Sequence, residues 1–175
     1  MATQTIDRLA ALRVGDVMTK DVLTVEVNQT MPEAARLFTE NHVSSAPVVD
    51  ELGHCVGVLT ATDFVKRESS LMPSNEDKLQ LVRSASDQAY HCVPVDNDYV
   101  RQRMSPAVQS IDADASLLRA SRVMCNEHIH RLFVIDPKNH PIGVISTMDI
   151  VAAMVNVIDE METQAPHLPA RSQQN

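Results

Sequence analysis

The feature that most constrains this chain is an internal repeat with a period of 86 residues, the offset between Met18 and Met104. Sliding the sequence by that offset superposes two long segments without a gap, which is typical of a duplicated folding unit. Further matched pairs are Val14 with Val100, Ala34 with Ala120, Arg36 with Arg122, His42 with His128, Val48 with Val134, and Asp63 with Asp149. A unit of about 50 residues buries little apolar surface by itself. We therefore expect the two copies to pack against each other with pseudo-two-fold symmetry.

Each copy predicts the same order of elements: strand, helix, strand, strand, helix. The expected strands are 22–27, 46–49 and 55–59 in the first copy, and 107–111, 132–135 and 142–145 in the second. Thr30 and Ser116 are the expected N-cap residues of the first helix in each repeat. These two helices should end near Asn41 and Glu127. The pattern predicts an α/β fold (α+β by some schemes) of two β-α-β-β-α repeats, each with helices on one face of a small sheet.

The repeats divide the 175 residues into five segments. We predict an N-terminal arm or short helix at 1–13, a first repeat at 14–67, an inserted connection at 68–99, a second repeat at 100–160, and a disordered tail at 161–175. Within the connection, a helix is expected around 77–89. The last helix of the second repeat has an apolar face too long for one small unit, which indicates a homodimer.

Composition excludes several classes of function. A net charge of −8 and 3% aromatic residues disfavour nucleic-acid binding. No apolar run approaches the roughly 20 residues that cross a bilayer, and no leader is evident, so a cytoplasmic location is expected. The three cysteines form no C-x-x-C pair, and His128-x-His130 lacks the further ligands of a metal site. No activated nucleophile or acid–base pair points to an enzyme.

One motif of the repeat carries chemistry. The stretch 57–63, Gly-Val-Leu-Thr-Ala-Thr-Asp, returns at 143–149 as Gly-Val-Ile-Ser-Thr-Met-Asp. A hydroxyl residue followed three places later by an acidic residue is a capping box, which binds the open N–H groups of a helix start. The same aspartate can accept hydrogen bonds from two adjacent hydroxyls, such as those of a ribose. The recurrence of the motif favours the ligand-binding interpretation.

Together with other motifs, these stretches resemble a tandem pair of cystathionine-β-synthase-type (CBS) domains, the Bateman module. The resemblance covers residues 14–66 and 100–152. It is carried by Asp-Val-Met-Thr at 16–19, Gln-Arg-Met-Ser at 102–105, Ser-Ala-Pro-Val-Val-Asp at 45–50, and the two glycine-to-aspartate stretches. The resemblance implies clefts between the repeats that bind adenine nucleotides or related adenosyl compounds, with a hydroxyl residue and an aspartate on the ribose.

Carried over residue by residue, the resemblance places Thr60 and Asp63 on one ribose, and Ser146 and Asp149 on the other. His130-Arg131 is similar to a His-Arg pair that contacts phosphates in the gamma subunit of AMP-activated protein kinase. Further implied contacts are Met18 and Met104 beside the base, and Ser45 and Pro47 in the ligand site. The first repeat has Ser44-Ser45-Ala46 where the second has His130-Arg131-Leu132, so its site lacks the cation.

Two functions remain open on the sequence. The first is a regulatory module without obligatory cofactor that binds AMP, ADP, ATP or S-adenosylmethionine and signals to a separate effector protein. The second is a dimerisation scaffold that binds no nucleotide, in which threonine and aspartate only cap helices. Lys20, Lys66 and Arg67 are expected to be solvated charges, with contact to a phosphate as the alternative.

Overall fold

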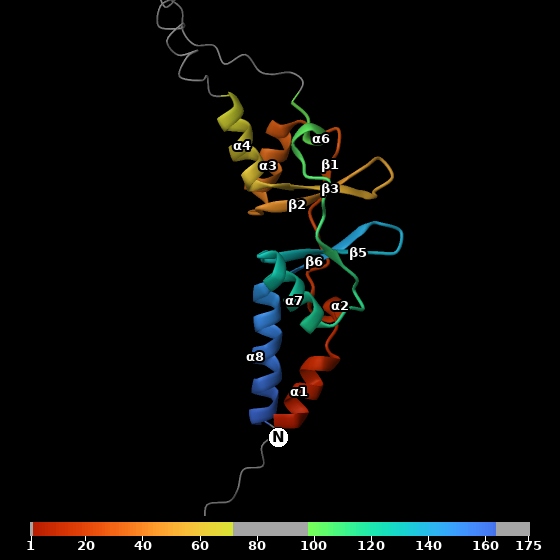
Figure 1. Cartoon of the computed structure of the whole chain (residues 1–175), viewed down its shortest axis with the longest axis vertical. Coiled ribbons are helices and arrows are strands. Elements are labelled where there is room, and N and C mark those ends of the chain that lie inside the picture. The colour runs from red at the N-terminus through yellow and green to blue at the C-terminus, as the bar shows by residue number, and fades with distance from the viewer. Residues whose placement is uncertain (1, 72–97, 164–175) are drawn as a thin grey trace, which may run out of the picture. The chain divides into compact units, whose positions relative to one another are not determined.

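The computed structural model describes residues 2–71 and 98–163 (Figure 1). The first repeat contains α2 (Val14–Val17), β1 (Val25–Glu26), α3 (Met31–Glu40), β2 (Ser45–Val49), β3 (Cys55–Thr60) and α4 (Ala61–Leu71). The second contains α6 (Val100–Arg103), β4 (Ser110–Ile111), α7 (Leu117–Glu127), β5 (Arg131–Ile135), β6 (Pro141–Ser146) and α8 (Thr147–Thr163). A further helix, α1 (Ala2–Ala11), precedes them. The predicted α/β class and the order of elements in each repeat are confirmed.

The chain divides into two compact units, each with its own sheet. Unit 1 takes Met1–Asp21, Ser110–Asp136 and Ile142–Asn175, and its strand order is β4-β5-β6. Unit 2 takes Val22–Gln109 and Pro137–Pro141, and its strand order is β1-β2-β3. The first strand of each sheet runs parallel to the second. In unit 2, β2 and β3 form an antiparallel pair with a bulge between Val48 and Val49.

The helix ends predicted from the sequence are present in both repeats. Thr30 caps α3 through a capping box with Glu33, whose backbone N–H donates to Thr30 Oγ1 at 3.4 Å. Ser116 caps α7 by accepting from the N–H of Arg119 at 3.2 Å. His42 follows α3 and His128 follows α7, and both residues have a left-handed φ of 54°. The two repeats therefore share even this uncommon backbone conformation.

Several predicted boundaries differ from the structure. The expected strands at 22–27 and 107–111 shorten to β1 and β4 because each pairs through only two residues, Val25 with Val48 and Glu26 with Val49 in the first case. Strands β3 and β6 include Thr60 and Ser146, and α4 and α8 begin directly after them. Helix α8 continues to Thr163. The helix expected at 77–89 lies outside the described residues.

The opening segment of each repeat lies in the unit that contains the sheet of the other repeat. Val14 is fully buried in the core of unit 1, and Thr19 forms a two-hydrogen-bond bridge with Val144 of β6, both bonds at 2.9 Å. Val100 is buried in the core of unit 2, and Ser105 forms the same bridge with Val58 of β3. Each unit is therefore built from both repeats.

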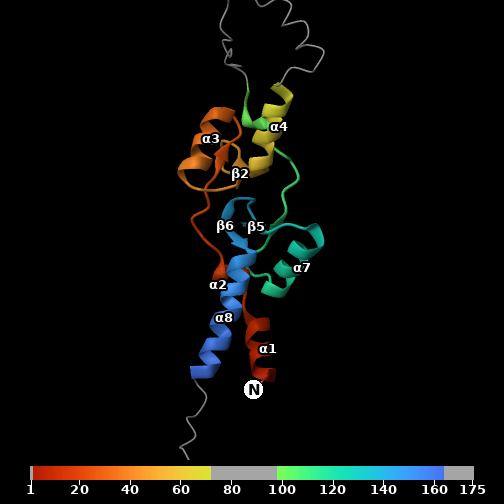
Figure 2. The same cartoon turned by 90° about the vertical axis from the view of Figure 1, so that its left-hand side faces the viewer.

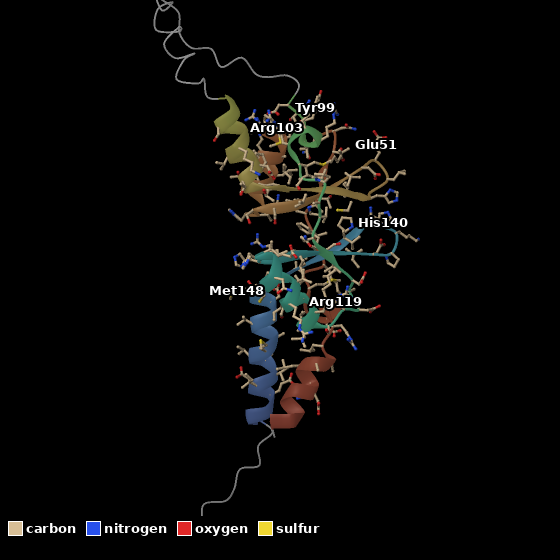
Figure 3. All side chains as sticks on the ribbon, in the orientation of Figure 1. Glu51, Tyr99, Arg103, Arg119, His140 and Met148 are labelled. Carbon is tan, nitrogen blue, oxygen red and sulfur yellow. The ribbon has the colours of Figure 1, made fainter. Side chains whose placement is uncertain are left out.

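The turn between β5 and β6 is the one part of its hairpin that belongs to unit 2. The backbone N–H of Cys55 donates to the carbonyl of Asn139 at 2.7 Å, and the Asn139 amide donates to the Cys55 carbonyl at 2.9 Å. His140, labelled in Figure 3, stacks on His54 with ring centroids 5.1 Å apart. These contacts fix the turn on unit 2.

An ion triad holds the opening segment of the second repeat to α4. Asp98 is only 4% exposed, and its two carboxylate oxygens accept from Nε of Arg67 on α4 and, at 2.9 Å, from Nε of Arg103 on α6. Figure 3 labels Arg103 beside Tyr99 at this end of unit 2. The expectation that Arg67 is a solvated charge is wrong, because its guanidinium pairs with a carboxylate 31 positions away along the chain.

Unit 1 fills the equivalent corner with apolar side chains. The repeat offset relates Asp98, Arg103 and Arg67 to Leu12, Val17 and Ala153. Leu12 and Val17 pack against the core of unit 1, and Ala153 is buried in it. At equivalent positions of the same fold, unit 2 therefore has ion pairs and unit 1 has apolar packing.

The triad is expected to make unit 2 sensitive to acid. Burial raises the pKa of Asp98, but the hydrogen bonds and charges of Arg67 and Arg103 outweigh burial and leave that pKa lowered. A lowered folded-state pKa contributes stability that is complete above the unfolded value of about 3.9 and is lost as pH falls through the folded value. Urea unfolding of wild type and Asp98→Asn should therefore differ by a constant amount from pH 5 to 7, and by less below about pH 4. A difference that grows on acidification would contradict this.

Candidate ligand-binding sites

In unit 2, a carboxylate is held at the junction of β3 and α4. Asp63 is buried, and its Oδ2 accepts from the backbone N–H of Thr60 at 2.8 Å and from Thr60 Oγ1 at 2.6 Å. Its other oxygen, Oδ1, lies 3.7 Å from Nζ of Lys66, a well-exposed side chain. The aspartate is thus oriented by its own helix start, and a carboxylate oxygen can accept more than one hydrogen bond.

Unit 1 repeats this geometry at the junction of β6 and α8. Asp149 Oδ2 accepts from the backbone N–H and from Oγ of Ser146, both at 2.7 Å. The Asp149 N–H donates back to Ser146 Oγ at 3.2 Å. The capping interpretation of the motif is therefore correct for Ser146 and Asp149, and in unit 2 the Asp63 carboxylate likewise binds the N–H at the start of its helix. This capping role does not exclude ligand binding. A carboxylate that is held in place at a helix start is already oriented to accept hydrogen bonds from a ligand.

The opening segments lie directly against the glycines of the motif. A Cβ built on Gly57 would stand 2.8 Å from both Met104 Sδ and the Ser105 carbonyl oxygen. A Cβ on Gly143 would stand 2.6 Å from Met18 Sδ and 3.0 Å from the Thr19 carbonyl oxygen. Both positions therefore require glycine because of close backbone approach.

These contacts regroup the predicted ligand residues. Met104, of the second repeat, belongs with Thr60 and Asp63 in unit 2, whereas Met18, of the first repeat, belongs with Ser146 and Asp149 in unit 1. The sequence offered no signal for this exchange, because a repeat offset relates equivalent residues without saying which copy supplies them to a unit.

Ser45 and Pro47 lie on β2 beside the carboxylate motif of unit 2. Ser45 is paired with Thr60 across the β2–β3 ladder, and Pro47 is paired with Val58. Pro47 is fully buried, whereas Ser45 is half-buried. Ser45 therefore lies directly across the ladder from Thr60, and Pro47 lies in the interior of unit 2.

Unit 1 carries positive charge at the equivalent place. Arg131 begins β5 at the repeat position of Ser45, and His130 precedes it; both side chains are exposed. The His130 carbonyl accepts from the N–H of Thr147 at 3.0 Å, which places this residue at the N-terminal end of α8. A long helix presents partial positive charge at that end. His130 and Arg131 therefore lie beside the N-terminal end of α8, whose first turn also carries Asp149.

No group of three or more His, Cys, Asp or Glu side chains among the described residues is arranged to hold a metal ion. In the same part of the chain, no helix combines the length and apolar character needed to cross a membrane.

The two units share a mixed α/β fold built on an internal repeat, and each has an aspartate hydrogen-bonded at the start of its last helix. These features define a class of paired, duplicated domains. The model of the CBS domain family matches residues 14–70 and 97–156. The chain belongs to the CBS domain family, which confirms the resemblance stated from the sequence.

Related proteins support the assignment. The chain is 30% identical over 146 residues to an uncharacterised protein, MJ1232, of Methanocaldococcus jannaschii; the match covers 83% of this chain and 40% of that protein. The chain therefore spans less than half the length of this relative. A CBS domain-containing protein of Dictyostelium discoideum is 25% identical over 154 residues, with 87% of this chain and 97% of that protein covered.

Solved structures show the same fold. The structure of CBSX2, a protein of Arabidopsis thaliana, in complex with AMP superposes with a TM-score of 0.64 at 22% identity, covering 83% of this chain and 98% of that one. The CBS domain pair of MJ0100, in complex with 5′-methylthioadenosine and S-adenosyl-L-methionine, gives a TM-score of 0.63 at 19% identity with the same coverage. At these identities the likeness shows the fold.

Proposed function

We propose that this CBS domain pair is a regulatory module that binds an adenosyl ligand: AMP, ADP, ATP or S-adenosylmethionine. The observation that carries the proposal is the aspartate fixed at the same helix start in both units, where Thr60 or Ser146 orients one carboxylate oxygen. A carboxylate held in place needs no reordering to accept the two adjacent hydroxyls of a ribose. The complexes of CBSX2 with AMP and of MJ0100 with adenosyl compounds support this ligand class.

Within the proposal, the two units differ in the ligand that they prefer. Asp149 would hold the ribose in unit 1, with Met18 beside the base and His130 and Arg131 near the phosphates. Arginine suits that role because it stays charged and binds two phosphate oxygens at once. In unit 2, Asp63 would hold the ribose, with Met104, Ser45 and Pro47 around the ligand. The uncharged Ser44-Ser45 pair there favours a ligand without phosphate.

The module acts in this proposal as a cytoplasmic homodimer without catalytic activity. Ligand binding shifts its conformation or its contacts, and a separate effector protein reads the difference through differential affinity for the two states. The alternative function is a dimerisation scaffold that binds no nucleotide. In that alternative, Asp63 and Asp149 form only their capping hydrogen bonds and bind no ligand.

Replacement of Asp149 by alanine tests the proposal. We expect Asp149→Ala to weaken AMP binding by at least about 100-fold in isothermal titration calorimetry, because hydrogen bonds to a charged acceptor contribute about 1.5–3 kcal/mol each and the variant loses both ribose bonds. Asp63→Ala is the matched control: it removes the same helix cap in the unit without His130 and Arg131, and should leave AMP affinity nearly unchanged. Circular dichroism of both variants verifies that the helices persist.

Two results would count against the proposal. Undiminished AMP binding by Asp149→Ala would remove the role assigned to this aspartate. The scaffold would be favoured if neither AMP nor S-adenosylmethionine raised the melting temperature of the wild-type chain, since a ligand at 100 times its dissociation constant stabilises a fold by about 2.7 kcal/mol.

A further inference from the structure

The turn between β5 and β6 is held in unit 2 by a set of contacts that we call the turn clasp. Its members are Asn139 and His140 of this turn, and His54 and Cys55 at the start of β3. The Cys55 N–H donates to the Asn139 carbonyl at 2.7 Å, and the Asn139 amide donates to the Cys55 carbonyl at 2.9 Å. The ring of His140 stacks on the ring of His54. Both backbone and side chains therefore hold the turn.

The two partners of the turn clasp are held in place by local structure. The Asp50 carboxylate accepts from the backbone N–H groups of Leu52 and His54, and its Oδ2 lies 3.2 Å from Nδ1 of His54. These bonds fix the His54 ring on which His140 stacks. Asn139 has a left-handed φ of 67°, a conformation that asparagine tolerates better than most residues.

The internal repeat shows that the turn clasp is one-sided. The repeat offset relates Asn139 to Gly53 and Cys55 to Pro141. Glycine has no side-chain amide, and proline has no backbone N–H. Gly53 and Pro141 therefore cannot form the pair of hydrogen bonds that Asn139 and Cys55 form. The clasp is a property of these particular residues rather than a requirement of the repeated fold.

The turn clasp connects the strands that carry the proposed ligand residues. β5 begins at Arg131 and β6 ends at Ser146, so both ends of this hairpin lie in the proposed site of unit 1 (Figure 2). The two strands are hydrogen-bonded neighbours in one sheet. β3 begins at Cys55 and ends at Thr60, whose N–H and hydroxyl bind Asp63. One hairpin and one strand, joined at the clasp, therefore run from one proposed site to the other.

We infer that the turn clasp couples the two ligand sites, so that AMP bound in unit 1 tightens the binding of S-adenosylmethionine in unit 2. The inference rests on the proposed function and adds a regulation to it. A ligand that contacts both Arg131 and Ser146 holds the two ends of the hairpin, and the clasp passes this ordering to β3. The second ligand then loses less conformational entropy when it binds, which is positive coupling. Thermodynamic linkage makes the effect reciprocal.

Isothermal titration calorimetry of the full-length chain tests the coupling. AMP is titrated into the wild type without and with saturating S-adenosylmethionine. We expect S-adenosylmethionine to lower the AMP dissociation constant by at least about 5-fold, and AMP to lower the S-adenosylmethionine constant by the same factor. Competition for one site would raise these constants, so the sign separates coupling from competition. Asp63→Ala, which removes the proposed ribose acceptor of unit 2, should abolish the effect.

A double variant, Asn139→Gly with His140→Ala, locates the coupling in the turn clasp. Glycine is the residue of the first repeat at this position, and it accepts the left-handed φ of Asn139 without strain. We expect the coupling factor to fall below about 2, with the constant for AMP alone changed by less than about 3-fold. A purely structural role would not change this factor selectively. Glu51→Ala is the matched control, because Glu51 is exposed in the neighbouring turn (Figure 3) and should leave the coupling intact.

The possible outcomes separate this inference from the proposed function. A wild type that binds both ligands without coupling, or a double variant with wild-type coupling, would overturn the inference and leave the proposed function standing. Equal loss of coupling in Glu51→Ala would also overturn it, because the clasp would then have no special part. A chain that binds neither ligand would overturn the proposed function and this inference with it.

Discussion

Asp98→Asn is expected to lower the free energy of unfolding by about 3 kcal/mol, because it leaves two partly buried arginines without their shared counter-charge. The asparagine amide keeps the size of the carboxylate, so the loss reports charge and hydrogen bonding rather than a cavity. Asp98 is only 4% exposed, and Arg67 and Arg103 converge on it from α4 and α6. Urea unfolding at pH 7, followed by circular dichroism, measures the change.

Glu68, which also pairs with Arg67, provides a control for this variant. Glu68 binds Nη1 of Arg67 at 2.6 Å but is exposed. Exposed ion pairs contribute little, so Glu68→Gln should change the unfolding free energy by less than about 1 kcal/mol. Equal losses of unfolding free energy in Asp98→Asn and Glu68→Gln would contradict this prediction, because the buried and the exposed carboxylate would then contribute equally.

The internal repeat suggests a second variant for the same experiment, in which the whole ion triad is replaced by apolar residues. The triple variant Arg67→Ala, Asp98→Leu, Arg103→Val gives unit 2 the residues that unit 1 uses at this corner: Ala153, Leu12 and Val17. Replacing a buried ion group as a whole by apolar residues is often neutral or stabilising, whereas removing one member is costly. We expect the triple variant to unfold within about 1 kcal/mol of wild type. A triple variant as unstable as Asp98→Asn would show that the apolar packing cannot be transferred between the units.

Gly57→Ala is the second variant with a large expected effect, a loss of about 2 kcal/mol. The new Cβ would stand 2.8 Å from Met104 Sδ and from the Ser105 carbonyl oxygen. The methionine can turn away, but the carbonyl is held by a backbone hydrogen bond from Val58 at 2.9 Å. We therefore expect the opening segment of the second repeat to separate from β3, with faster hydrogen exchange at the amides of Val58 and Ser105.

Gly15→Ala is the matched control for this prediction. Its Cβ would approach the Ala113 carbonyl oxygen to only 3.3 Å, and Gly15 lies in α2, where alanine has the higher helix propensity. Its effect should stay within about 0.5 kcal/mol of zero. Slow exchange at Val58 and Ser105 in Gly57→Ala would mean that β3 can accept a Cβ without releasing the segment.

Much of each repeat follows from local pattern. Hydroxyl residues at Thr30 and Ser116 predicted the helix starts, because a side-chain oxygen can bind only the nearby N–H groups that a helix leaves open. The motif from Gly57 to Asp63 predicted a strand that runs into a helix, which the structure confirms. The strands at 22–27 and 107–111 were predicted too long, since alternation does not reveal how many residues find a partner strand.

The contacts that assemble the units could not be predicted in the same way. Asp98 meets Arg67 across 31 positions, and no periodicity relates the two. The apolar counterpart at Leu12, Val17 and Ala153 shows that the repeat does not determine the chemistry of this corner either. Both solutions satisfy the same backbone, so only the packed structure shows which residues meet there.

The sequence by itself determined the duplication, the α/β elements and the two capped aspartates, because each depends on residues close together in the chain. The tertiary structure decided which opening segment joins which sheet. Met104 lies against Gly57, and Met18 lies against Gly143, so each proposed ligand-binding set draws on both repeats. The physical reason is that the bridges between Ser105 and Val58 and between Thr19 and Val144 use backbone groups, which every residue carries and no sequence pattern identifies.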